Sequence, residues 1–170
     1  SEKLISLPGD FGIINLNAFE IDKEGNVYLA GDGQYPDGPG FSMASFVMKT
    51  SKTFVTRWSR MDSVQTSYTR LHVDNQQRVT LIEDFYSMYP AIKVIRINKT
   101  GTQATAITVV PDSMRYNLYS LIDKKNNLFL YGGKMVNDSV QAAFLCKLPA
   151  NAGSLHFRKT IHTAPSSLMN

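Results

Sequence analysis

One sequence pattern occurs three times in this chain, at intervals of about 50 residues. Each copy consists of an apolar run, a polar turn that begins with aspartate, and a second apolar run, over residues 18–31, 70–82 and 119–132. The aspartates that open the turns are Asp22, Asp74 and Asp123. Repeats of roughly 20–50 residues are typical of propellers and solenoids, in which each repeat folds as one supersecondary unit. The chain must therefore build three similar units in succession.

The composition of the turn predicts its conformation. An aspartate at the start of a turn accepts hydrogen bonds from backbone amides one or two residues ahead. Gly25 and Asn126 stand where a tight hairpin requires a positive φ, which both residue types tolerate. Gln77 holds this place in the second copy and matches the pattern least well. After each turn, alternate apolar residues predict a strand with one face formed by Val27 and Leu29, Val79 and Leu81, or Leu128 and Leu130.

Two further strands are predicted in each repeat. The third strands cover residues 46–49, 94–97 and 144–147. The fourth strands cover residues 54–58, 104–109 and 156–161. Four antiparallel strands in about 50 residues, repeated along the chain, are typical of β-propeller blades. We therefore predict an all-β fold, a β-propeller of four-stranded antiparallel blades of which three are present.

The repeat resembles a known family. Residues 21–31 (IDKEGNVYLAG) and 44–49 (ASFVMK) are similar to the SBBP (seven-bladed β-propeller) and delta-60 type bacterial repeats, and residues 142–148 (AAFLCKL) match the second half of that pattern. The middle copy departs from it, with Gln77-Arg78 in place of Gly-Asn and Glu83-Asp84 in place of glycine. The resemblance implies a propeller, and an extracellular, cell-surface or periplasmic location in the bacterial envelope.

The predicted blades cover most of the chain. They occupy residues 11–64, 65–112 and 113–163, after a closing strand of a preceding blade at 1–10 and before a tail at 164–170. A propeller closes with roughly four blades or more. Three blades therefore predict part of a longer propeller, or half of an assembly, whose partner is another protein or the remaining blades.

Charge and composition exclude several classes of function. The chain has 18 Lys and Arg against 14 Asp and Glu, a formal net charge of +4, and its basic residues are scattered. Nucleic-acid binding proteins cluster these residues on one face, so we expect no nucleic-acid partner. No apolar run approaches the ~18 residues of a membrane span, so none is predicted. The single cysteine, Cys146, excludes an internal disulfide and a cysteine-based zinc site.

Two segments between predicted second and third strands are candidate contact surfaces. Clustered Gly and Pro predict a long loop at 31–40, and an aromatic and acidic segment follows at 83–90. Aromatic rings beside carboxylates suit sugar binding, although the same rings also suit packing between blades. The candidate ligand-binding residues are Asp32, Tyr35, Asp37, Glu83, Asp84, Tyr86 and Tyr89.

We expect no cofactor and assign no metal site, with calcium as the alternative. Asp32 and Asp37 offer oxygen ligands, but the segment lacks the spacing of an EF-hand loop.

These features predict a non-enzymatic binding or scaffold module, part of a secreted or cell-surface propeller that contacts protein or glycan through its inter-strand loops. One alternative is a glycan hydrolase or lyase with its active site in the central channel. Its acidic candidates are Glu20, Glu83 and Asp84, although no residue is assigned as catalytic. The other alternative is a subunit of an envelope assembly.

Overall fold

The computed structural model describes residues 11–62, 67–84, 92–109, 115–137, 140–151 and 156–162, and every regular element in these ranges is a β-strand. The strands are β1 (Ile13–Ile21), β2 (Val27–Asp37), β3 (Gly40–Thr50), β4 (Thr56–Asp62), β5 (Ser67–Val73), β6 (Val79–Asp84), β7 (Ile92–Ile97), β8 (Ala104–Val109), β9 (Arg115–Ile122), β10 (Leu128–Asn137), β11 (Val140–Leu148) and β12 (Phe157–His162). The all-β class predicted from the repeat is confirmed.

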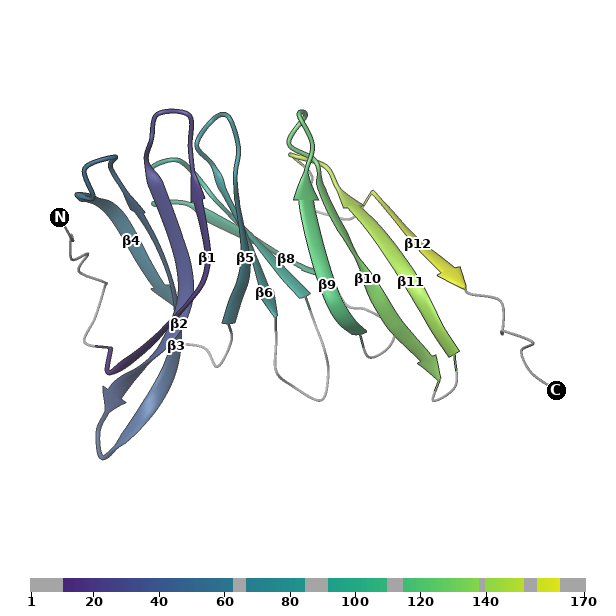
Figure 1. Ribbon diagram of the computed structural model, residues 1–170, viewed down its shortest axis with the longest axis horizontal. Helices are drawn as coiled ribbons and strands as arrows, with labels where there is room; N and C mark the ends of the chain where they lie inside the picture. Colours follow the sequence, from purple (N-terminus) through teal and green to yellow (C-terminus); the bar gives the residue numbers. More distant parts are fainter. Residues whose placement is uncertain are drawn as a thin grey trace. The chain divides into compact units, whose positions relative to one another are not determined.

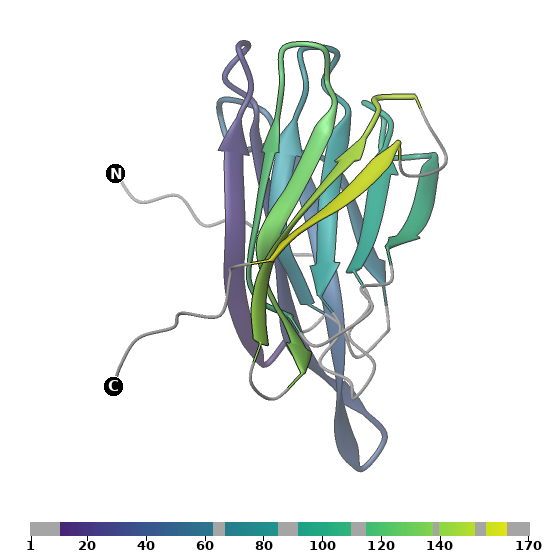
Figure 2. The ribbon, with the colours of Figure 1, turned by 90° about the vertical axis from the view of Figure 1, so that its right-hand side faces the viewer.

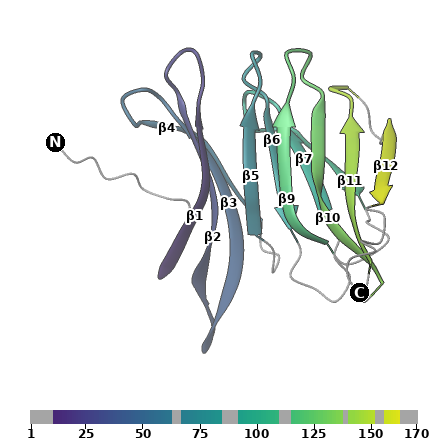
Figure 3. The same ribbon diagram turned by 45° about the vertical axis from the view of Figure 1, so that its right-hand side comes forward.

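The strands form three four-stranded sheets, each in chain order (Figure 1). The first sheet contains β1 to β4, the second β5 to β8, and the third β9 to β12. Paired neighbours run antiparallel. Figure 3 shows β5, β6 and β7 side by side in the second sheet. Each repeat of the sequence thus builds one antiparallel meander.

The chain divides into two compact units. One contains residues 1–87 and 92–108, with the first and second sheets, and the other contains residues 88–91 and 109–170, with the third sheet. The predicted closing strand at 1–10 and the tail at 164–170 lie outside the described residues.

The three aspartate turns share one hydrogen-bonding pattern. Asp22 Oδ1 accepts the backbone N–H groups of Glu24 and Asn26, both at 2.9 Å. Asp74 and Asp123 accept the corresponding amides in their own turns. The carboxylate therefore binds the amides two and four residues ahead, whereas the sequence predicts those one and two residues ahead. The bond to the amide four residues ahead spans the turn and closes it.

The predicted left-handed position is confirmed in all three turns. The φ angle is 82° at Gly25, 62° at Gln77 and 62° at Asn126. Gln77, the weakest match in sequence, adopts the same conformation as the other two, although its Cβ makes that conformation unfavourable. The carboxylate bonds of Asp74 on either side of Gln77 hold the turn in this shape.

A register shift recurs in the pairing of the first two strands of each sheet. It lies between Leu16 and Ala18 in the first sheet, between Tyr68 and Arg70 in the second, and between Tyr131 and Gly133 in the third. In the first sheet this irregularity brings the backbone of Asn15 against Gly31, where an added Cβ would lie 2.0 Å from the Asn15 carbonyl oxygen. Glycine is therefore required at this position.

The core of the first unit lies between its two sheets. Tyr28, Ala30 and Val47 of the first sheet belong to one buried cluster with residues of the second sheet, namely Tyr68, Leu71, Val79, Leu81, Ile95 and Ile97. Trp58 packs against this cluster and donates from Nε1 to the carbonyl oxygen of Lys99 at 3.1 Å. The period-two alternation read from the sequence thus places Tyr28 and Ala30 on one face, opposite Val79 and Leu81.

The prediction of a long loop at 31–40 is wrong. Strand β2 continues to Asp37 and β3 begins at Gly40, so only Gly38 and Pro39 form the turn, with a φ of 59° at Gly38. Pro36 is tolerated within β2 because β1 pairs with β2 only as far as Gln34, so no described strand requires an N–H group from Pro36 on that edge. The cluster of Gly and Pro therefore marks a tight hairpin turn.

Candidate functional site

The end of the β2–β3 hairpin forms an arm, residues 35–42, whose strands pair only with each other among the residues that the structure describes. Strand β1 pairs with β2 up to Gln34, and β4 pairs with β3 from Ser45 onward. The hairpin consequently projects past β1 and β4, as Figures 1 and 2 show. The side chains of the arm are therefore held on a backbone that is fixed by its own strand pairing.

The tip of the arm carries an exposed aromatic side chain. Phe41 is 72% exposed and lies directly across the strand pair from Pro36, which is also exposed. An exposed Phe beside Pro forms a small apolar surface of the kind that fills a pocket in a partner. Phe41 is not among the residues predicted from the sequence, where the aromatic contact of this segment is assigned to Tyr35.

The two predicted residues of the arm, Tyr35 and Asp37, are engaged with their neighbours. Tyr35 is partly buried, and its ring meets that of Phe11 edge to face, with centroids 6.5 Å apart. Asp37 accepts a hydrogen bond from Ser42 Oγ at 2.5 Å, which ties the two strands of the arm together. Tyr35 and Asp37 therefore support the arm that displays Phe41.

Asp32, predicted as a ligand-binding residue, is buried between the first and second sheets. It accepts hydrogen bonds from Asn15 Nδ2 at 3.0 Å, Asn17 Nδ2 at 2.5 Å and Ser67 Oγ at 2.6 Å. Ser67 begins β5, so this carboxylate joins the two sheets. Calcium binding at Asp32 and Asp37 is not favoured by this arrangement, since the two carboxylates serve separate internal contacts.

Glu83 is also buried, on β6, where Lys93 Nζ lies 3.1 Å from Oε2. Asp84 is the last residue of β6 and pairs through its backbone with Ser67 and Ile92. The predicted residues Tyr86 and Tyr89 lie outside the described part of the chain. The structure therefore brings Asp32 and Glu83 into the interior of the same unit, whereas Tyr35 and Asp37 lie on the arm.

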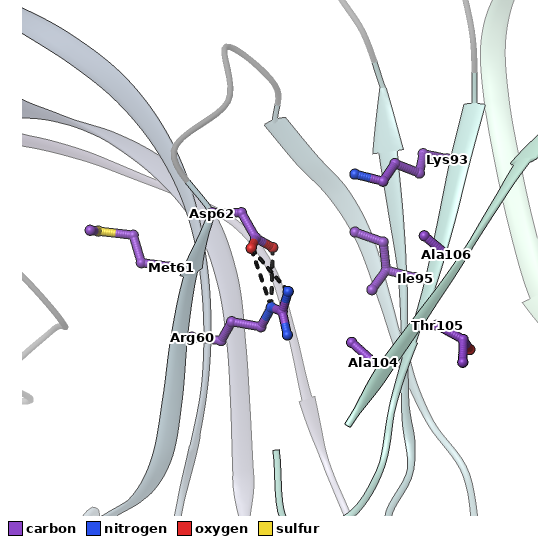
Figure 4. A pocket seen from close by; sticks show the side chains of 8 residues that line it. All are labelled: Arg60, Met61, Asp62, Lys93, Ile95, Ala104, Thr105 and Ala106. Carbon is purple, nitrogen blue, oxygen red and sulfur yellow. Dashed lines mark hydrogen bonds and ion pairs between the residues drawn. The ribbon is translucent and has the colours of Figure 1, made fainter. Parts of the chain in front are cut away.

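A pocket of about 300 Å³ opens beside this interior, between β4 of the first sheet and β7 and β8 of the second. Figure 4 shows Arg60 and Asp62 on one wall, with Lys93 and Ile95 on the other. The remaining lining residues are Met61, Ala104, Thr105 and Ala106. Met61 points to the opposite side of β4 in this view.

The charges at the pocket form two ion pairs. Arg60 Nη2 lies 3.1 Å from Asp62 Oδ1, and Tyr68 donates its hydroxyl to Asp62 Oδ2. Burial favours a higher pKa for Asp62, but the hydrogen bonds from Arg60 and Tyr68 outweigh it and hold the pKa below its usual value. Burial and the adjacent Asp62 raise the pKa of Tyr68, so its hydroxyl stays protonated. With Lys93 and Glu83 paired as well, the wall of the pocket is locally neutral.

Glu20, the remaining acidic candidate, holds the two sheets together. Its Oε2 accepts the backbone N–H of Val73 on β5 at 2.8 Å. Burial raises the pKa of Glu20, and the bond from Val73 opposes this rise only in part. Glu20, Asp32 and Glu83 thus each bind groups of the protein itself.

The described residues contain no group of three or more His, Cys, Asp or Glu side chains arranged to hold a metal ion. Nor does any helix long and apolar enough for a membrane crossing occur in the part of the chain that the structure describes. Cys146 is buried in β11.

Comparison with known proteins gives no family assignment. No protein-family model matches the chain, and no curated protein sequence matches it.

Proposed function

We propose that this chain is a non-enzymatic binding module, part of a secreted or cell-surface β-propeller, whose hairpin arm contacts a protein partner. The single observation that carries the proposal is the arm at 35–42, which projects from the first sheet and exposes Phe41 at its tip. The sequence resemblance to bacterial propeller repeats supports the propeller and its location.

The engagement of the acidic residues favours binding over catalysis. A glycosidase needs two carboxylates that face the substrate at roughly 5–10 Å from each other. Glu20 accepts a backbone amide, Asp32 accepts three side-chain donors, and Glu83 pairs with Lys93. The pocket lining includes one carboxylate, Asp62, which Arg60 and Tyr68 already engage.

A display selection tests the proposal. Peptides are selected from a random library against the intact chain, and their affinities are measured for the wild type, for Phe41→Ser and for Val55→Ser. Val55 is an exposed apolar residue outside the arm and serves as the matched control. We expect Phe41→Ser to weaken binding at least about tenfold, as for a contact in the centre of an interface, and Val55→Ser to leave it unchanged. Equal affinities for all three proteins would refute the role of the arm.

A polysaccharide panel separates the remaining alternatives. Binding of a polysaccharide that Phe41→Ser abolishes would assign a glycan, rather than a protein, to the arm. Release of new sugar ends, lost in Glu83→Gln with the fold retained, would instead establish the glycan-active enzyme.

A further inference from the structure

The interface between the first and second sheets has two different faces. The first sheet contributes the face that carries Tyr28 and Ala30, and the second contributes the face that carries Val79 and Leu81. We name these the Tyr28-type face and the Val79-type face. Polar contacts join them as well: among these, Glu20 accepts the N–H of Val73, and Lys49 Nζ donates to Gln77 Oε1 at 2.7 Å.

The repeat assigns the same two faces to every sheet. Counting from Asp22 and Asp123, Phe129 and Tyr131 of β10 stand at the positions of Tyr28 and Ala30. Counting from Asp74, Val27 and Leu29 of β2 stand at the positions of Val79 and Leu81. The third sheet therefore has a Tyr28-type face, and the first sheet has a Val79-type face on its other side.

The Tyr28-type face of the third sheet is exposed. Tyr119, Leu121 and Tyr131 are between 40% and 48% exposed, and the rings of Tyr119 and Tyr131 stack with centroids 5.4 Å apart. Lys147 lies over the ring of Phe129 at 5.6 Å, as Lys49 lies over the ring of Tyr28 at 5.1 Å. The pair of Phe129 and Lys147 thus repeats the pair of Tyr28 and Lys49 that faces the second sheet in the other unit.

The Val79-type face of the first sheet is exposed as well. Phe19 and Ile21 on β1 are 66% and 58% exposed, and they pair across the strands with Leu29 and Val27. Contiguous apolar surface of this kind marks an interaction site. In the second sheet the equivalent positions, Leu71 and Val73, pack in the core of the first unit.

We infer that two copies of this chain associate head to tail, with the Tyr28-type face of the third sheet of one copy on the Val79-type face of the first sheet of the other. The two exposed faces correspond, by position in the repeat, to the two halves of the interface between the first two sheets. They differ from each other, so the contact is heterologous. Lys147 stands in the third repeat where Lys49 stands in the first. In the first sheet of the other copy, the position of Gln77 is taken by Gly25, and Glu24 beside it supplies a charge opposite to that of Lys147. The inference is independent of the role proposed for the arm.

Sedimentation velocity over a concentration series tests the inference. Tyr131→Glu disables the face of the third sheet, since Tyr131 stands at the position of the buried Ala30, and Phe19→Glu disables that of the first; both residues are exposed. The wild type is expected to associate. Each variant alone is expected to self-associate with a dissociation constant at least about tenfold higher, so that it is monomeric at concentrations at which the wild type is not. An equimolar mixture of the two variants is expected to form a 1:1 dimer, because one intact face remains on each. Val55→Glu, outside both faces, is expected to associate as the wild type does.

Three outcomes would overturn the inference. A wild-type chain that stays monomeric at every concentration shows that a second copy does not fill these faces. Association of both variants at wild-type strength shows that another surface is used. Monomeric variants that fail to combine when mixed show that the contact joins like faces. Circular dichroism of each variant establishes that its strands are retained.

Discussion

Lys49 and Gln77 join the two sheets of the first unit by a hydrogen bond from Nζ to Oε1 at 2.7 Å, while the backbone of Gln77 holds a left-handed φ of 62°. The residue that makes this contact is thus the one that fits the turn least well. Glycine at this position would relieve the turn but remove the bond.

Gln77→Gly is therefore expected to change the free energy of unfolding differently in the presence and in the absence of Lys49. A left-handed conformation costs a residue with a Cβ about 1–2 kcal/mol, whereas a hydrogen bond from a charged group contributes about 1.5–3 kcal/mol. We expect Gln77→Gly to be neutral or destabilising in the wild type, and to stabilise by about 1 kcal/mol in a Lys49→Met background. Urea unfolding of the four proteins of this double-mutant cycle measures the difference, and identical effects in both backgrounds would contradict the contact.

Asp62 is expected to make stability depend on acid pH. The pKa of Asp62 is lowered in the folded protein. Its contribution to the free energy of unfolding is therefore complete above ~3.9, the pKa of aspartate in an unfolded chain, and is lost as the pH falls through the lower pKa of the folded protein. Asp62→Asn should destabilise by about 1–2 kcal/mol at pH 7, after allowance for the partial exposure of Arg60. The difference from the wild type should shrink as the pH falls below about 4. Asp37→Asn, on the exposed arm, should change stability by less than about 0.5 kcal/mol in the same unfolding measurements.

Glu20 is expected to change the pH dependence of stability in the opposite direction to Asp62. Its pKa is raised by burial, so the folded state gains stability relative to the unfolded state as the pH falls through the raised value. Glu20→Gln keeps an oxygen that accepts the Val73 amide and removes the buried charge. The variant should be at least as stable as the wild type at pH 7, and this advantage should disappear between neutral pH and pH 4. A variant that is clearly less stable at pH 7 would show that the charge itself stabilises the interface.

Gly31→Ala should severely destabilise the first sheet. The new Cβ would lie 2.0 Å from the carbonyl oxygen of Asn15 and 3.1 Å from Cζ of Phe46, and the backbone oxygen has no room to move without breaking the pairing of β1 with β2. We expect a loss of about 3 kcal/mol or more in the free energy of unfolding. Gly40→Ala is the matched control, since its nearest neighbour would be 3.9 Å away, and its melting temperature should stay near that of the wild type.

Much of the local structure is predictable from the residues. The third and fourth strands overlap the short runs rich in Val, Ile and Phe that predict them, and the aspartate turns adopt the expected left-handed residue at Gly25, Gln77 and Asn126. The strand predicted at 54–58 is displaced, because Phe54 lies in a turn with a φ of 64° and β4 begins only at Thr56. These features depend on alternation within a strand and on hydrogen bonds within a turn, both of which act over a few residues. The segment at 31–40 was mispredicted because its Gly and Pro residues suit either a loop or a hairpin, and pairing of β2 with β3 decides between them.

The sequence by itself determined the three-fold repeat, the strands and turns of each copy, and therefore which residues share a face of each sheet. Only the tertiary structure decided what those faces do. Asp32 and Glu83 are indistinguishable from solvated loop acids in the sequence, yet they are buried because the second sheet packs on the first. Phe41 is exposed because β1 and β4 end before the hairpin does. Burial depends on contacts between residues distant along the chain, which a local pattern does not encode.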